Sequence, residues 1–160
     1  MEEVYVPDKT FRENFFRLNG RLNRWRFFKR SILLLLIAFV LVALLTIGLI
    51  IAVAHAPQRM SAEQFLATDS GVAIMLAGAA ILLFMEASSY CLVVRRLHDL
   101  GYGKTFAVIY TVGTSLQFIT NEELSNALGL IFLIPGLWLT FKKGTVGANE
   151  YGPDPLNDGV

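Results

Sequence analysis

Two long stretches without charge dominate this sequence. Residues 31–56 contain no Asp, Glu, Lys or Arg, and residues 71–94 contain only Glu86. At about 1.5 Å per residue the first stretch would form a helix of roughly 39 Å, against a hydrocarbon layer of about 30 Å. Each stretch therefore predicts a transmembrane helix. A mean hydropathy of +0.53 over 160 residues is also too high for a soluble domain of this size.

Two shorter apolar segments follow, at 105–120 and 126–141. The Asn121-Glu122-Glu123 connection between them would be costly to bury in lipid. That cost favours two thin spans, and the alternative is a re-entrant hairpin that enters and leaves on one side. We therefore expect an all-α, polytopic helical membrane protein with four transmembrane helices, the last two short.

The N-terminal segment, residues 1–30, mixes basic and aromatic side chains. Thr10 followed by Glu13 fits a capping box, and Asn23 can cap a second helix. Cations and aromatic rings in this mixture suit the headgroup layer of a membrane. We expect an interfacial amphipathic helix whose apolar positions recur at helical spacing and whose C-cap is Asn19-Gly20; these positions are Phe11, Phe15, Leu18 and Leu22.

Basic residues are unevenly distributed between the connecting segments. Of the 14 Lys and Arg, 13 lie in residues 1–30, 95–104 and 142–160, and the loop 57–70 holds only Arg59. With four spans, the three basic segments lie on one side. By the positive-inside rule this side, with both termini, is cytoplasmic. Membrane lipids, above all anionic ones, are the expected partners.

Three motifs occur in these basic segments: Gly20-Arg21-x-x-Arg24, then Arg95-Arg96-Leu97-His98-Asp99-x-Gly101, then Gly144-x-x-Gly147-x-Asn149-x-Tyr151-Gly152-Pro153-Asp154-Pro155. In order and spacing they resemble the small bacterial inner-membrane proteins catalogued as domain of unknown function 805. The resemblance covers nearly the whole chain. It implies a multi-pass protein of the bacterial inner (plasma) membrane, and no established activity.

The predicted topology places all three motifs on one side of the membrane. We expect their polar residues to form one cytoplasmic cap over the helix ends. One interpretation is a structural latch, in which Asp99 and Asp154 neutralise arginines. The other is a site for an anionic ligand or a lipid headgroup. The residues of the predicted cap are Arg21, Arg24, Arg95, Arg96, His98, Asp99, Asn149, Tyr151 and Asp154.

Glu86 lies nine residues before Arg95, about 13 Å from the inner end of the second span. A carboxyl group at that depth faces protein or water, or is protonated. Ser89 and Tyr90 share its helical face, so the three residues can hydrogen-bond within the helix bundle. Two hypotheses follow: a carboxyl that aligns helices or subunits, and a proton or cation relay.

The candidate chemistry of the remaining residues is sparse. His98 and Asp99 are adjacent, so on a helix they do not face each other and make a poor catalytic dyad. His55 and His98 are predicted on opposite sides, and with one cysteine, Cys91, they offer no metal cluster. We expect no catalytic residues, cofactor, metal or nucleic-acid partner. The expected protein is a non-enzymatic component that acts through a homo-oligomer or an envelope complex; the alternative is a small oligomeric transporter or channel using Glu86.

Overall fold

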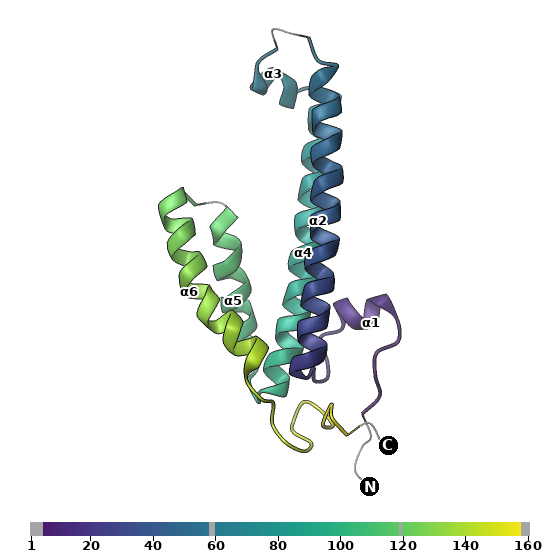
Figure 1. The fold of residues 1–160 in the computed structure, drawn as a ribbon, viewed down its shortest axis with the longest axis vertical. Helices are drawn as coiled ribbons and strands as arrows, with labels where there is room; N and C mark the ends of the chain where they lie inside the picture. The colour runs from purple at the N-terminus through teal and green to yellow at the C-terminus, as the bar shows by residue number, and fades with distance from the viewer. Residues whose placement is uncertain (1–4, 58–59, 119, 158–160) are drawn as a thin grey trace. The chain divides into compact units, whose positions relative to one another are not determined.

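The computed structural model describes residues 5–57, 60–118 and 120–157, and the regular elements within them are helices (Figure 1). An isolated bridge joins Asn149 and Gly152. The expected all-α fold is confirmed. Arg59 and position 119 of the predicted third span lie outside the described residues, as do the first and last few residues of the chain.

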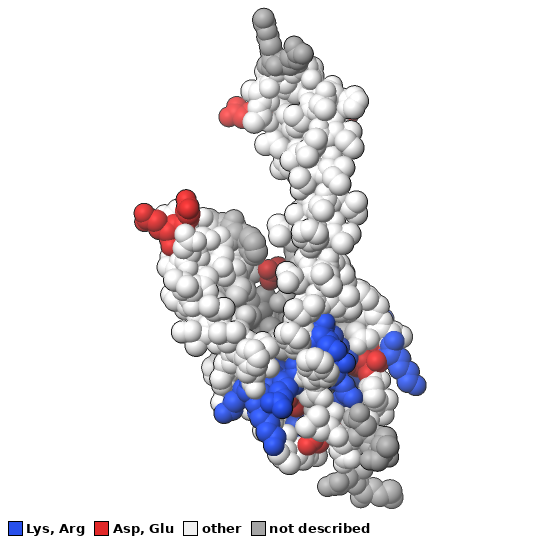
Figure 2. All heavy atoms as spheres, viewed as in Figure 1, with Lys and Arg blue, Asp and Glu red and all other residues white. Residues whose placement is uncertain are grey.

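The chain divides into two compact units. Met1–Ile32 and Glu86–Val160 form one of them, which we call the basic unit. Leu33–Met85 form the other, the apolar unit. In the space-filling view, Lys and Arg side chains gather at the lower part of the basic unit (Figure 2).

Three helices are long and apolar enough to cross a membrane: α2 (Arg24–Ala54, 31 residues), α4 (Asp69–Asp99, 31 residues) and α6 (Glu122–Phe141, 20 residues). Even the shortest would extend about 30 Å, which matches a hydrocarbon layer. This finding supports the predicted multi-pass membrane protein. The basic residues from Arg24 onward belong to α2 itself, so the predicted second interfacial helix and the first span are one continuous helix.

The third predicted span is shorter than expected. Helix α5 (Thr105–Ser115) has 11 residues and passes into the 3-10 turn η1 (Leu116–Phe118). Eleven residues extend only about 16 Å. The structure therefore contains three helices of spanning length in its described residues, and the fourth full span is not confirmed.

Helices α5 and α6 pack against each other within the basic unit (Figure 1). The ring of Phe132 lies where a Cβ on Gly113 would stand, so the missing side chain of this glycine lets the α6 ring pack against the backbone of α5. Helix α6 begins earlier than predicted because Asn121 caps it, its Oδ1 accepting the N–H of Leu124 at 3.0 Å. Glu122 thus belongs to the first turn of α6, where a carboxylate suits the helix dipole.

The apolar unit consists of α2 from Leu33 onward, the short helix α3 (Ala62–Leu66) and α4 up to Met85. A Cβ added to Gly78 of α4 would lie 3.5 Å from Cδ2 of Leu45 of α2, an ordinary packing distance. The predicted polar loop 57–70 contains the short helix α3, and Ser61 and Gln64 form a capping box at its start.

Helix α1 (Phe11–Phe16) begins as predicted and ends too early. Thr10 and Glu13 form the expected capping box. The chain then leaves the helix at Arg17, which is extended, so the predicted continuation to a C-cap at Asn19-Gly20 is wrong. A tertiary hydrogen bond accounts for the difference: the N–H of Leu22 donates to the carbonyl oxygen of Arg95 at 3.0 Å.

Candidate functional site

The last turns of α4 carry three buried ionised side chains. Arg95, Arg96 and Asp99 are 1%, 0% and 2% exposed, and Arg21, from the segment before α2, is 1% exposed. Burying a charge is costly unless it is paired and hydrogen-bonded. The interactions of these four residues therefore show what this part of the basic unit is built to do.

Asp99 lies between two arginines. Its Oδ1 accepts hydrogen bonds from Nε and Nη2 of Arg21, at 3.2 and 3.1 Å. Its Oδ2 accepts from Nη1 of Arg96, which is three positions earlier on α4 and so on the same face. One carboxylate thus joins the N-terminal segment to α4.

The same two arginines reach the C-terminal part of the chain through carbonyl oxygens. Arg96 donates from Nε to Leu139 at 2.7 Å and from Nη2 to Lys142. These are carbonyls of the last turn of α6 and its C-cap, which lack partners within a helix. Arg21 donates from Nη2 to the carbonyl oxygen of Thr145 at 2.6 Å and from Nη1 to that of Gly147.

Asp8 is a second buried carboxylate, and the sequence reasoning missed it. Its side chain is fully buried and pairs with Arg95 at 2.6 Å, Arg30 at 3.0 Å and Arg17 at 3.0 Å. Burial raises the pKa of Asp8, but the hydrogen bonds and charges of Arg95 and Arg30 outweigh burial and hold that pKa below its usual value. The sequence did offer one signal for such a residue: the predicted cap contained more arginines than carboxylates, so a further carboxylate was needed to pair with them.

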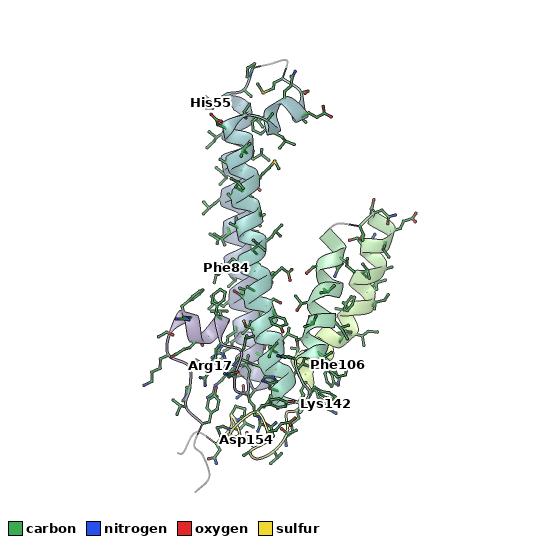
Figure 3. The ribbon with its side chains drawn as sticks, turned by 180° about the vertical axis from the view of Figure 1, so that it is seen from behind. Arg17, His55, Phe84, Phe106, Lys142 and Asp154 are labelled. Atoms are coloured by element: carbon green, nitrogen blue, oxygen red, sulfur yellow. The ribbon has the colours of Figure 1, made fainter. Side chains whose placement is uncertain are left out.

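Asp154 was predicted to neutralise arginines, but no ion pair between Asp154 and an arginine occurs among the described residues. Its Oδ2 accepts the backbone N–H of Gly147 at 2.8 Å, and its Oδ1 accepts that of Leu156 at 2.9 Å. The carboxylate thus folds the tail back on itself at the lower end of the basic unit (Figure 3). The ion pairs of the site belong to Asp8 and Asp99. We call Arg21, Arg95, Arg96, Asp8 and Asp99 the latch.

Three other predicted residues lie together beside the latch. The rings of His98 and Tyr151 stack with centroids 4.1 Å apart, and Nδ1 of His98 lies 3.2 Å from the carbonyl oxygen of Gly20. Nδ2 of Asn149 donates to the carbonyl oxygen of His98 at 3.0 Å. These contacts connect the tail to both other motifs. Arg24, the last predicted residue, is exposed at the start of α2.

Two of the motif glycines, Gly101 and Gly144, stand at positions where the structure favours glycine. Gly101 ends α4 with φ +81°, and the N–H of Tyr102 donates to the carbonyl oxygen of Leu97 at 2.8 Å, which is the pattern of a Schellman cap. Gly144 passes directly over Asp99, and a Cβ there would overlap the carboxylate. The tail can thus approach the latch only with glycine at this position.

The intramembrane residues Glu86, Ser89 and Tyr90 are half-buried on α4. No side-chain hydrogen bond of these three residues occurs in the part of the chain that the structure describes. Ser88 is instead fully buried, and its Oγ has no hydrogen-bond partner. A search of the described residues for groups of three or more side chains that could hold a metal found none.

The match to a family model covers most of the site and the three long helices. The model of the proteins of unknown function named DUF805 matches residues 15–153, which include the first two motifs and the third as far as Pro153. The chain belongs to the DUF805 family. A search of curated proteins and a search of solved structures found no match. Asp8 lies outside the matched residues, so the family match includes Asp99 of the latch and not its second carboxylate.

Proposed function

We propose that this protein is a non-enzymatic component of the bacterial inner membrane that acts through assembly, with itself or with an envelope protein. The observation that carries the proposal is the use of the motif side chains. Both oxygens of Asp99 and each nitrogen of Arg21 and Arg96 are engaged within the protein. Groups held in this way are suited to joining chain segments, because a catalytic group needs a face open to its substrate.

The spans supply the surface for assembly. In the most apolar window of α2, α4 and α6, only 6% of residues are buried. Lipid covers such helices, and a second protein can cover them equally well. Packing between small side chains would favour a protein partner over lipid along part of this surface.

The orientation belongs to the same proposal. The basic unit contains all Lys and Arg except Arg59, so the positive-inside rule supports a cytoplasmic location for its charged segments and for both termini. The C-terminal end of α6 is held at the latch by Arg96, and the Asn121-Glu122-Glu123 connection at its other end would be costly to bury in lipid. We therefore propose that α5 with η1 crosses the membrane as a thin fourth span. A Glu123→Cys protein should then react with a membrane-impermeant maleimide added outside intact cells. Labelling only after the membrane is broken would indicate the re-entrant hairpin.

Native mass spectrometry of the protein released from its own membranes tests the assembly. A homo-oligomer or a stoichiometric foreign subunit is the expected result. A monomer that carries only lipid, at protein concentrations found in the membrane, would contradict the proposal. A foreign subunit would make the cytoplasmic face of the basic unit the first place to search for contacts.

If the protein forms a closed homo-oligomer without a foreign subunit, this result would favour the alternative function, a transporter or channel. Four short helices enclose little volume, so a pore would require several subunits. Glu86 is then the residue to test, because a half-buried carboxyl within an apolar helix is expected to face protein or water. A Glu86→Gln protein that keeps both its assembly and its ion or proton flux would exclude the relay.

A further inference from the structure

A cleft in the basic unit adjoins the latch and shares Asp99 with it. It is about 380 Å³ in volume and opens between the start of α2 and the tail. Asn23, Arg24 and Trp25 line one wall, and residues 143–146 and 154–156 line the other. The carboxylate of Asp99 forms part of its lining.

The charge of this cleft is positive. Arg24 and Lys143 are both exposed, and no ion-pair partner for either occurs among the described residues. Of the two carboxylates in the lining, Asp99 is paired with Arg21 and Arg96, whereas Asp154 accepts backbone N–H groups and keeps its negative charge. With these two arginines counted, four cationic side chains, Arg21, Arg24, Arg96 and Lys143, stand against the two carboxylates, so an anion in the cleft would meet a net positive charge.

The start of α2 adds hydrogen-bond donors to the same wall. Oδ1 of Asn23 accepts the N–H of Arg26 at 2.8 Å, which completes the cap one turn into the helix. The preceding N–H groups, of Arg24 and Trp25, have no acceptor in the described part of the chain. Such groups at the start of a 31-residue helix favour a bound phosphate oxygen.

Most of the remaining lining is apolar, and three of its side chains are exposed. Trp25, Val146 and Leu156 are 61%, 81% and 70% exposed. Trp25 stacks on Phe28 at 5.8 Å, and Nζ of Lys29 lies 5.6 Å from the Trp25 ring, a combination typical of side chains at a membrane interface. A ligand that fits these walls carries a phosphate and an apolar body.

The position of the cleft along α2 identifies the source of such a ligand. The uncharged run of α2 begins at Ser31, seven residues after Arg24, or about 10 Å along the helix. The cleft thus lies at the level of the headgroups when the apolar run is in the hydrocarbon. We infer that this cleft binds the phosphate of an anionic lipid headgroup between Arg24 and Lys143, with Trp25 and Leu156 against the start of the acyl chains. This inference goes beyond the proposed assembly and does not depend on it.

Lipid binding by the purified full-length chain tests the inference. Protein in a neutral detergent is titrated with phosphatidylglycerol or phosphatidylcholine, and bound lipid is counted by native mass spectrometry. The test variant is Arg24→Gln with Lys143→Gln. The matched control is Arg12→Gln with Lys104→Gln, which removes the same charge from two exposed positions outside the cleft lining.

We expect the wild type and the control to prefer phosphatidylglycerol. The test variant should lose roughly thirtyfold in affinity, because each cation near an anionic lipid contributes about 1 kcal/mol. Val146→Glu is a second variant, which adds a repelling carboxylate at an exposed wall and removes no hydrogen bond of the latch. It should weaken binding as well, with an unchanged thermal unfolding midpoint.

Three results would overturn the inference. Equal loss of binding in the test and control variants would show attraction by net charge without a site. Equal binding of phosphatidylcholine by the wild type would show that the anionic headgroup is not recognised. If millimolar inorganic phosphate displaces phosphatidylglycerol from the cleft, the ligand is a soluble phosphate compound and the lipid assignment is wrong.

Discussion

The two units of this protein are held together by different kinds of interaction. In the apolar unit, the described side-chain hydrogen bonds join residues no more than four positions apart, such as Thr46 and Val42. In the basic unit, charged side chains bind groups as far as 129 positions away, as Arg26 does at Pro155. The apolar unit can thus rely on the membrane to align its helices, whereas the basic unit specifies its own arrangement.

The difference shows where single substitutions should matter. Helices in lipid keep their backbone hydrogen bonds whatever surrounds them, so local polar contacts in the apolar unit add little. Buried charges in the basic unit cannot be left without partners. Matched pairs of substitutions, one in each unit, therefore test whether the free energy of unfolding depends more on the basic unit.

Removing the carboxylate at the centre of the latch should have the largest effect. Asp99→Asn leaves Arg21 and Arg96 buried without their anion and should lower the free energy of unfolding by about 3–5 kcal/mol. Denaturation in detergent micelles, followed by circular dichroism, measures the change. The control is Asp69→Asn, at the exposed first turn of α4, with a cost below about 1 kcal/mol. Equal losses in the two proteins would show that the units do not differ.

Asp8→Asn should come next, at about 1.5–3 kcal/mol, because it weakens charged hydrogen bonds to Arg95 and Arg30. Its signature is a dependence on pH. The pKa of Asp8 is lowered in the folded protein, so this carboxylate stabilises the fold above its ordinary pKa of about 3.9 and ceases to do so as the pH falls through the lower, folded value. The wild type should lose stability in that acid range, and Asp8→Asn should lose less there. Parallel pH curves would rule this out.

A methyl group on Gly144 should cost about 1–3 kcal/mol, because it overlaps the Asp99 carboxylate, which is held by hydrogen bonds from Arg21 and Arg96. The matched control is Gly48→Ala in the apolar unit, where a Cβ would meet nothing within 4 Å. That control should be neutral, or stabilising by up to about 1 kcal/mol, since alanine favours a helix. Destabilisation by both substitutions would mean that crowding at Asp99 is not the cause.

The smallest effect is expected at the margin of the basic unit. Arg17 also binds Asp8, but its side chain is 47% exposed. Arg17→Gln should cost about 0.2–1 kcal/mol, and added salt should reduce the difference from the wild type. A loss as large as that of Asp8→Asn would show that the exposed arginine matters as much as the buried ones.

The features that the sequence predicted are those recorded locally in it. The apolar runs that became α2 and α4 were predictable because crossing a membrane requires a certain apolar length. The gathering of the motifs followed from topology. Their pairing did not: Asp8 binds residues 9, 22 and 87 positions away, and no periodic pattern marks such a residue. The early end of α1 was missed for the same reason, because Leu22 is held by Arg95 and not by its own helix.

The contacts of Arg96 also impose an order on the synthesis and folding of this protein. Two of its acceptors, the carbonyl oxygens of Leu139 and Lys142, are synthesised more than 40 residues after the arginine itself. Until the last helix has left the ribosome and inserted, the guanidinium lacks them and is best kept in water at the membrane surface. Closure of the latch therefore requires the last helix to be in place, and a chain that ended before Leu139 would leave the guanidinium of Arg96 without these two acceptors.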